Sequence, residues 1–316
     1  MANVKPNGKR SAARTEILLE SGTNELEIME FTIAGDSFGI NVAKVTEIMQ
    51  YEGVKPMPNS QSSIEGVFMP RDVILTVVDL AHYMGLPPSE DNTRDMLIVT
   101  SFNKMNAAFH VHTVETIHRI NWNQIEKPDT TIYGGEEGLA TGIAKIGSKL
   151  ITIVDFEKIV FDISPQTGIQ MSEISDLGPR ARSTKPVVMA EDSDLLKKMV
   201  VEALTQAGYA NIKAFTNGQD AWEHLQAMRD EVMATGDAIG SRVAAIITDI
   251  EMPKMDGHRL TKLTRDDRIL KDIPVIIFSS LIDEAMQVKG EQLGATAQLS
   301  KPEIGNLVGT LDKHIL

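Results

Sequence analysis

Acidic, hydroxyl and basic side chains follow four apolar runs in the second half of the chain. Glu191 and Asp192 come directly after one run, and Asp249 comes just after another. Ser279 follows a third run and Lys301 a short fourth one. Three neighbouring carboxylates repel one another unless a cation lies among them, and an all-oxygen ligand set favours Mg²⁺. Lysine and serine can hold phosphoryl oxygens, so these residue types predict phosphoryl chemistry.

The runs that precede these side chains have the pattern of buried strands separated by helices. Parallel strands that alternate with helices form a doubly wound α/β sheet, and its active site lies beyond the carboxyl ends of the strands. The five side chains are therefore expected to meet at one edge. We predict strands over 186–190, 243–247, 274–278 and 297–300, and helices over 194–207, 221–233 and 257–265.

These elements resemble the receiver domain of two-component response regulators over about residues 185–316. The resemblance is carried by Glu191-Asp192, the segment DIEMPKMDG at 249–257, Ser279 and Lys301-Pro302, in this order. It implies a flavodoxin-like sheet of five parallel strands. A chance set of solvated loop acids is the alternative, and five elements in register disfavour it. The implied roles are Asp249 as phospho-acceptor, Ser279 and Lys301 as phosphoryl-binding switch residues, and Glu191, Asp192, Asp249 and the backbone carbonyl of Glu251 as ligands of Mg²⁺.

Two residues depart from the receiver pattern. Gln298 stands where receivers usually carry a switch aromatic, so output by rotation of an aromatic ring is in doubt. Glu251 lies two residues after Asp249 and is expected to face the site, near the path of a hydrolytic water. We therefore predict that Glu251 alters the lifetime of the acyl phosphate.

The first half of the chain is rich in short strands and predicts barrels rather than a parallel sheet. A short helix is also expected over 11–20, ahead of the strands. The predicted strands cover 26–33, 38–42, 73–78, 95–100, 107–111, 138–146 and 150–154.

Three segments of this half, 38–48, 64–71 and 73–80, resemble the CheW-type coupling domain, and 139–155 supports the match. The resemblance covers about residues 25–160. It implies an all-β double SH3-like barrel without catalytic activity, which bridges chemoreceptor tips to the chemotaxis histidine kinase. The partner-binding positions of that family fall on Val45, Glu47, Gly66 and Arg71.

Simple core packing is an equally good explanation for Val45. Arg71 is the stronger candidate, because an arginine between two strands is seldom buried unpaired. Its loop departs from the family, since residues 69–72 read MPRD instead of NLRG. Proline removes a backbone donor and aspartate replaces a flexible glycine, so the geometry of this loop is open.

The composition limits the class of protein. The 316 residues contain no cysteine, which excludes disulfide frameworks and thiolate sites, and the net charge is −13. This charge divides into −7 for residues 1–185 and −6 for residues 186–316. An acidic chain is a poor match for nucleic acid, and no apolar run approaches the length of a membrane span. We expect no nucleic-acid partner, no membrane insertion, and a cytoplasmic protein associated with receptor arrays.

The expected order is a tail with a short helix (1–24), a CheW-like domain (25–162), a linker with at most one helical turn (163–185) and a receiver (186–316). This order resembles the CheV-type chemotaxis proteins. It implies an adaptor, rather than an enzyme, whose coupling to receptors and kinase is modulated by phosphorylation of Asp249.

Two alternatives remain: a receiver that acts mainly as a phosphate sink, and a phosphohydrolase with an aspartyl nucleophile. A DNA-binding regulator is disfavoured because the chain ends just after the last receiver helix. His110 and His112, two residues apart, could hold a metal but are better explained as structural.

Overall fold

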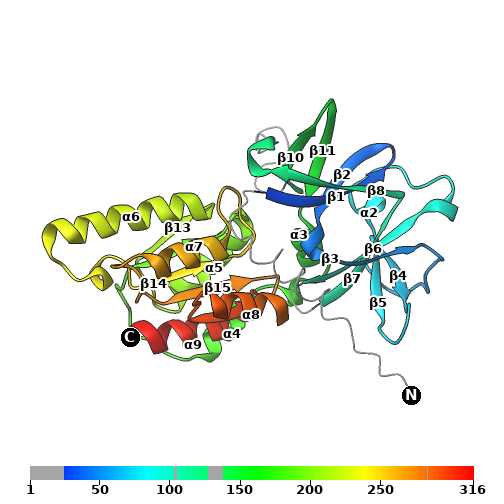
Figure 1. The fold of residues 1–316 in the computed structure, drawn as a ribbon. Coiled ribbons are helices and arrows are strands. Elements are labelled where there is room, and N and C mark those ends of the chain that lie inside the picture. The colour runs from blue at the N-terminus through cyan, green and yellow to red at the C-terminus, as the bar shows by residue number, and fades with distance from the viewer. Residues whose placement is uncertain (1–24, 103–104, 127–137, 283) are drawn as a thin grey trace, which may run out of the picture.

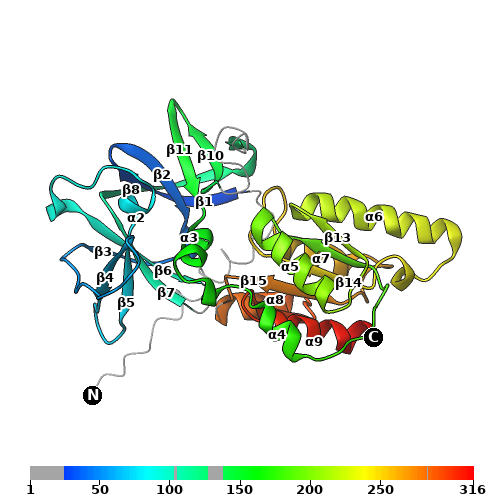
Figure 2. The same ribbon diagram turned by 180° about the vertical axis from the view of Figure 1, so that it is seen from behind.

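The computed structural model describes residues 25–102, 105–126, 138–282 and 284–316. It comprises a β domain (residues 25–163), an α/β domain (residues 186–316) and a connecting segment (residues 164–185), as Figures 1 and 2 show from opposite sides. The helix predicted over 11–20 lies outside the described residues. Within the described ranges, no helix is both long and apolar enough to span a lipid bilayer.

The β domain consists of two sheets, which confirms the all-β prediction. The first has six strands in the order β8-β1-β2-β11-β10-β9. Its edge strand β9 has only two residues. The second has the order β3-β6-β7-β5-β4. The strands of the first sheet are β1 (Glu25–Ile33), β2 (Asp36–Asn41), β8 (Thr113–Asn121), β9 (Ile125–Glu126), β10 (Ala140–Ile146) and β11 (Lys149–Val154). Those of the second are β3 (Val45–Gln50), β4 (Ile64–Phe68), β5 (Leu75–Asp79), β6 (Met96–Phe102) and β7 (Met105–Val111).

Strands β3 and β4 were not predicted, and the boundaries of β5, β6 and β7 differ from the prediction, most informatively at β5. The apolar run at 73–78 was expected to be strand throughout, but β5 begins at Leu75. Val73 and Ile74 are exposed in the loop before it. Apolar character therefore marks surface residues here, and only the second part of the run enters the core.

Helix α3 (Phe156–Ile163) closes the core of the β domain. Its apolar stripe of Phe156, Ile159 and Val160 is fully buried, and the Phe156 ring centroid lies 4.6 Å from that of Phe109. The Asp155 side chain caps the helix by accepting from the backbone N–H of Lys158 at 3.0 Å. The other helical segments of this domain are α2 (Leu80–Tyr83) and the 3₁₀ turns η1 (Val42–Lys44), η2 (Asn92–Arg94) and η3 (Trp122–Gln124).

The α/β domain is the predicted doubly wound parallel sheet, with the order β13-β12-β14-β15-β16. Alternate residues of β12 pack into two different core clusters, one on each face, because neighbouring side chains of a strand point to opposite sides. The strands are β12 (Val187–Ala190), β13 (Ile212–Phe215), β14 (Ala245–Thr248), β15 (Val275–Ser279) and β16 (Ala297–Ser300). The helical segments are α5 (Asp194–Gln206), α6 (Gly218–Thr235), η6 (Ile239–Ser241), α7 (Gly257–Asp266), α8 (Glu284–Gln292) and α9 (Ile304–Ile315).

The connecting segment is folded against the α/β domain, although its composition favours an open linker. It holds the 3₁₀ turn η5 (Pro165–Thr167) and helix α4 (Met171–Asp176). Ile169 and Ile174 are buried in the same core cluster as α9, and Glu173 accepts from the backbone N–H of Gly305 at 2.9 Å. The predicted helical turn is present, but it is part of a packed structure.

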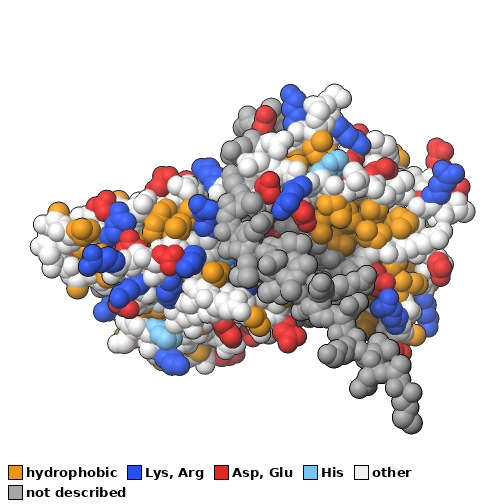
Figure 3. All heavy atoms as spheres, in the orientation of Figure 1, with side chains coloured by type: hydrophobic (Ala, Val, Ile, Leu, Met, Phe, Trp, Pro, Cys, Tyr) orange, Lys and Arg blue, Asp and Glu red, His pale blue; other side chains and the backbone are white. Residues whose placement is uncertain are grey.

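Charged side chains are spread over the surface of both domains. On the face in Figure 3, Lys and Arg side chains alternate with Asp and Glu, and an apolar patch lies over the β domain. This distribution agrees with the nearly equal division of net charge between the two halves of the sequence.

Candidate functional site

Three carboxylates meet at the carboxyl edge of the parallel sheet, as the sequence predicted. Glu191 and Asp192 follow β12, and Asp249 follows the adjacent strand β14. One oxygen from each of the three lies within 4.8 Å of the others. Asp249 is 4 % exposed and Glu191 is 3 % exposed. The site is therefore an acidic cluster largely removed from solvent.

Lys301 lies among these carboxylates at the end of β16. Its Nζ donates to Asp249 Oδ2 at 2.7 Å and to Glu191 Oε1 at 3.2 Å, and the side chain is buried. Burial alone would lower the pKa of Lys301, but the surrounding carboxylates of Asp249 and Glu191 raise it well above its ordinary value. The lysine is therefore a fixed positive charge.

One lysine does not neutralise three carboxylates. Burial raises the pKa of Glu191 well above its usual range, and burial followed by the charge of Asp249 raises the pKa of Asp192 to about 7. A cation bound among these carboxylates would stabilise their charged forms, and oxygen ligands suit a hard divalent ion. The donor set therefore fits Mg²⁺.

The position of Asp249 is fixed by its neighbours. Its Oδ1 accepts from the backbone N–H of Ile250 at 2.6 Å. Gly257 packs against its carbonyl so closely that a Cβ at position 257 would lie 1.8 Å from that oxygen. Only glycine fits, which gives a physical reason for the glycine that ends the 249–257 segment.

Ser279 ends β15 and is fully buried. Its hydroxyl oxygen accepts from the backbone N–H of Leu281 at 3.3 Å, and its carbonyl accepts from the backbone N–H of Lys301 at 3.2 Å. Gln298 on β16 donates to the carbonyl of Gln287 at 2.6 Å. An amide that packs against α8 thus occupies the place of a switch aromatic.

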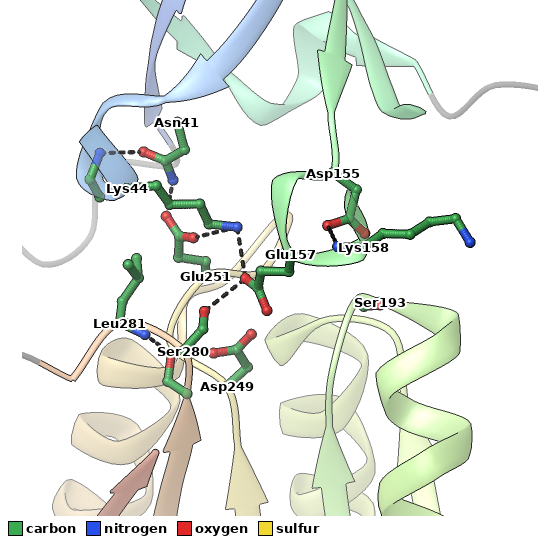
Figure 4. A network of polar contacts seen from close by, with 12 residues as sticks. Asn41, Lys44, Asp155, Glu157, Lys158, Ser193, Asp249, Glu251, Ser280 and Leu281 are labelled. Atoms are coloured by element: carbon green, nitrogen blue, oxygen red, sulfur yellow. Dashed lines mark hydrogen bonds and ion pairs between the residues drawn. The ribbon is translucent and has the colours of Figure 1, made fainter. Parts of the chain in front are cut away.

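The β domain covers this site, which the sequence did not predict. Side chains from both domains line a cleft of about 240 Å³ that includes Asp192, Asp249 and Lys301 on one side. The opposite side includes Lys44 and Glu157. Figure 4 shows Glu157 descending from the start of α3 toward Ser280 and Asp249.

Glu157 contacts both domains. Its Oε1 accepts from Lys44 Nζ of the β domain at 2.8 Å and from Ser280 Oγ of the α/β domain at 2.7 Å. Its Oε2 lies 3.7 Å from Lys301 Nζ. Burial would raise the pKa of Glu157, but the charges of Lys301 and Lys44 outweigh it and hold that pKa at about 2. Glu157 is therefore a carboxylate at neutral pH.

Glu251 lines the same cleft as Asp249, as expected, but the β domain binds its side chain. Its Oε1 accepts from Asn41 Nδ2 and its Oε2 lies 3.5 Å from Lys44 Nζ. Burial raises the pKa of Glu251 to about 7. The predicted effect of Glu251 on the acyl phosphate remains a prediction, and the structure adds a second role in contact between domains.

The four predicted partner-binding residues lie in the second sheet or its loops. Val45 and Glu47 are on β3, and Val45 packs partly buried against the core. Glu47 accepts from Arg71, which follows β4, at 2.9 Å, and Arg71 is exposed. This pair connects the edge strand β3 to the loop that follows the other edge strand, β4. Gly66 is buried, and a Cβ there would lie 2.4 Å from the carbonyl oxygen of Lys55.

The two histidines have separate structural partners. His110 Nδ1 lies 2.9 Å from Glu65 and its Nε2 lies 3.0 Å from Asp95. His112 lies beyond the end of β7 and accepts from the backbone N–H of Ala34 at 3.0 Å. Among the described residues, the only group of three side chains suited to a metal is the carboxylate cluster.

Sequence reasoning missed the residues that join the two domains. They belong to the end of β2, to η1, to the first turn of α3 and to the loop after β15, and no local pattern marks them. Leu281 of that loop is 9 % exposed and packs with the core of the β domain. The missed residues are Asn41, Lys44, Glu157, Ser280 and Leu281.

Comparison with known proteins gives two domain families and several relatives. Residues 27–163 match the CheW-like domain and residues 187–312 match the response regulator receiver domain. Chemotaxis protein CheV3 of Helicobacter pylori is 31% identical over 291 residues, which are 88% of this chain and 91% of the relative. Chemotaxis protein CheV2 of the same organism is 26% identical, with 92% and 95% coverage.

Proposed function

Because the chain belongs to the CheV family of chemotaxis proteins, we propose that it couples chemoreceptors to the histidine kinase and that phosphorylation of Asp249 modulates this coupling. The observation that carries the proposal is the Asp249 site. A buried, lysine-bound carboxylate in an acidic cluster lies in the same chain as a CheW-like domain. The partners are the chemotaxis kinase and the cytoplasmic tips of chemoreceptors.

The chemistry is transfer of a phosphoryl group from a phosphohistidine of the kinase. An Asp249 oxygen attacks phosphorus in line, the new O–P bond forms as the P–N bond breaks, and the imidazole leaves. Lys301 neutralises charge on the phosphoryl oxygens. Glu191, Asp192, Asp249 and the carbonyl of Glu251 would hold Mg²⁺. When bound, this ion would supply further neutralisation of phosphoryl charge.

Transfer of labelled phosphate from a chemotaxis kinase tests this proposal. We expect label on the parent chain in Mg²⁺ and none on Asp249→Asn or in a chelator. Label on Asp249→Asn at the parent's level would contradict the assignment of the acceptor.

A second measurement separates modulation from a phosphate sink. Receptor-stimulated kinase activity and docking strength are measured with the parent or Asp249→Asn chain. We expect both to change with phosphorylation of the parent. Identical docking in every phosphorylation state would favour a sink, which drains phosphate without altering coupling.

A further inference from the structure

We propose that Glu157 is an internal latch, which holds the two domains together over the unphosphorylated site and is displaced by a phosphoryl group on Asp249. This inference rests on the proposed phosphorylation of Asp249. It adds the route by which that event reaches the β domain. The latch consists of Lys44 and Glu157 on the β domain and Glu251, Ser280 and Lys301 on the α/β domain.

Glu157 uses the cation that an Asp249 phosphoryl group needs. Lys301 Nζ lies 2.7 Å from Asp249 and 3.7 Å from Glu157, so both carboxylates share one lysine. A phosphoryl group on Asp249 adds negative charge beside the Glu157 carboxylate. Like charges in a buried site repel strongly, and Lys301 cannot neutralise both groups. Phosphorylation therefore disfavours the closed arrangement.

Helix α3 fixes the origin of the Glu157 side chain. Asp155 caps the helix, and Phe156 is buried against Phe31 and Phe109 in the β-domain core. The backbone at Glu157 therefore moves only with its domain. A rotation of the Glu157 side chain can relieve only part of the repulsion. The rest can be relieved only if the two domains separate.

The loop after β15 provides a second connection to the same core. Ser280 donates to Glu157, and the side chain of Leu281 packs in the β-domain core. The backbone N–H of Leu281 donates to Ser279 Oγ. If the Ser279 hydroxyl turns toward a phosphoryl oxygen, its hydrogen bond with the backbone N–H of Leu281 changes. Leu281 is the residue of this loop that packs in the β-domain core. The loop thus supplies a path for output that needs no aromatic at Gln298.

The latch also predicts how fast the site is phosphorylated. Asp249 is 4 % exposed beneath the β domain, so a phosphodonor reaches it from the open arrangement. Weakening the latch raises the open population and the rate. We expect Glu157→Gln and Lys44→Gln each to accept phosphate from acetyl phosphate roughly 5- to 10-fold faster than the parent. Glu173→Gln is the matched control for Glu157→Gln, because it makes the same charge change in a contact outside the residues that line the cleft.

The distance between domains is measured on the full-length chain. The chain has no cysteine, so Ser148→Cys and Ala227→Cys place one spin label on each domain, both at exposed positions. We expect a single short distance for the unphosphorylated parent. A longer, broader distribution is expected after acetyl phosphate with Mg²⁺, and in Glu157→Gln and Lys44→Gln without phosphate.

The outcomes separate the latch from the proposed function. Failure of acetyl phosphate and of the kinase to label Asp249, in the parent and in both latch variants, would overturn the proposed function. Labelling of Asp249 with an unchanged distance distribution would overturn the latch and leave the function standing. Parent-like rates and distances in Glu157→Gln and Lys44→Gln would overturn it as well.

Discussion

The Ser280 hydroxyl donates to the Glu157 carboxylate at 2.7 Å and joins two residues that lie 123 positions apart in the chain. Ser280 directly follows β15, and Glu157 lies in the first turn of α3, the helix that closes the β-domain core. This bond places the loop after β15 in direct contact with the CheW-like domain. This contact and the neighbouring sites can be tested by substitutions, by addition or removal of Mg²⁺ and by changes of pH.

Leu281→Ala tests the apolar part of the contact between domains. Loss of this nearly buried side chain leaves a cavity in the β-domain core cluster. We expect the free energy of unfolding to fall by about 2 to 3 kcal/mol in urea titrations. Val288→Ala, at an exposed position on α8, should change it by less than about 0.5 kcal/mol. Equal effects of the two substitutions would argue against a packed role for Leu281.

Mg²⁺ is expected to stabilise the α/β domain through the carboxylate cluster. At a free concentration of about 100 times Kd, a ligand that binds only the folded state adds about 2.7 kcal/mol. Thermal unfolding with Mg²⁺ or a chelator should show this gain in the parent and lose most of it in Asp192→Asn. Asp194→Asn, an exposed acid two residues away, serves as the control. A full gain in Asp192→Asn would remove that residue from the metal site.

The carboxylate cluster was predictable because each of its members follows a recognisable strand. The carboxyl ends of parallel strands lie at one edge of the sheet, so the sequence alone was enough to predict that Glu191, Asp192 and Asp249 lie close together. The Glu157–Ser280 contact has no such rule. It depends on how two completed surfaces fit, and neither residue stands in a pattern that differs from an ordinary helix start or loop.

The packing of the connecting segment could not be predicted, for a physical reason. Its few apolar residues are scattered among Ser, Pro and Gly, which is typical of a linker. Two of them, Ile169 and Ile174, are buried, and the helix that contains Ile174 has only six residues. So short an amphipathic pattern is not distinguishable from chance in the sequence.

Gly66→Ala is expected to lower the stability of the β domain rather than to affect partner binding directly. A Cβ at this position would lie 2.4 Å from the Lys55 carbonyl, so the backbone between β4 and its neighbour must shift. We expect a loss of about 1 to 3 kcal/mol in unfolding free energy. An unchanged unfolding curve combined with lost kinase binding would instead make Gly66 part of a docking surface.

Arg71→Ala is expected to have the opposite effect, with reduced partner binding and nearly unchanged stability. Its ion pair with Glu47 is exposed, and exposed pairs contribute about 0 to 1 kcal/mol. The unfolding free energy should therefore change little, while affinity for the kinase or receptor falls in a pull-down or titration. Parent-like binding to both partners would exclude Arg71 from the interface.

His110 makes the stability of the β domain depend on pH. Burial would lower its pKa, but Glu65 and then Asp95 raise it above the ordinary value. A raised pKa in the folded state contributes stability that is complete below the unfolded pKa of about 6.5 and disappears as pH rises through the folded pKa.

His110→Gln should therefore cost more unfolding free energy at about pH 6 than at about pH 9. Urea unfolding followed by Trp122 fluorescence, in a Trp222→Phe background, reports this domain. His112→Gln is the control. A cost for His110→Gln that is independent of pH would contradict the ionised contact.

The packed connecting segment limits what the chain can do after the domains part. Helix α3 ends in one core and Ile169 lies in the other, which leaves residues 164–168 as the tether. As a flexible chain, this segment would span only about 12 Å even with η5 unwound, so separated surfaces would face each other at millimolar effective concentration. The proposed opening would therefore be limited in extent, and the contact between the domains would re-form quickly once the phosphoryl group is lost.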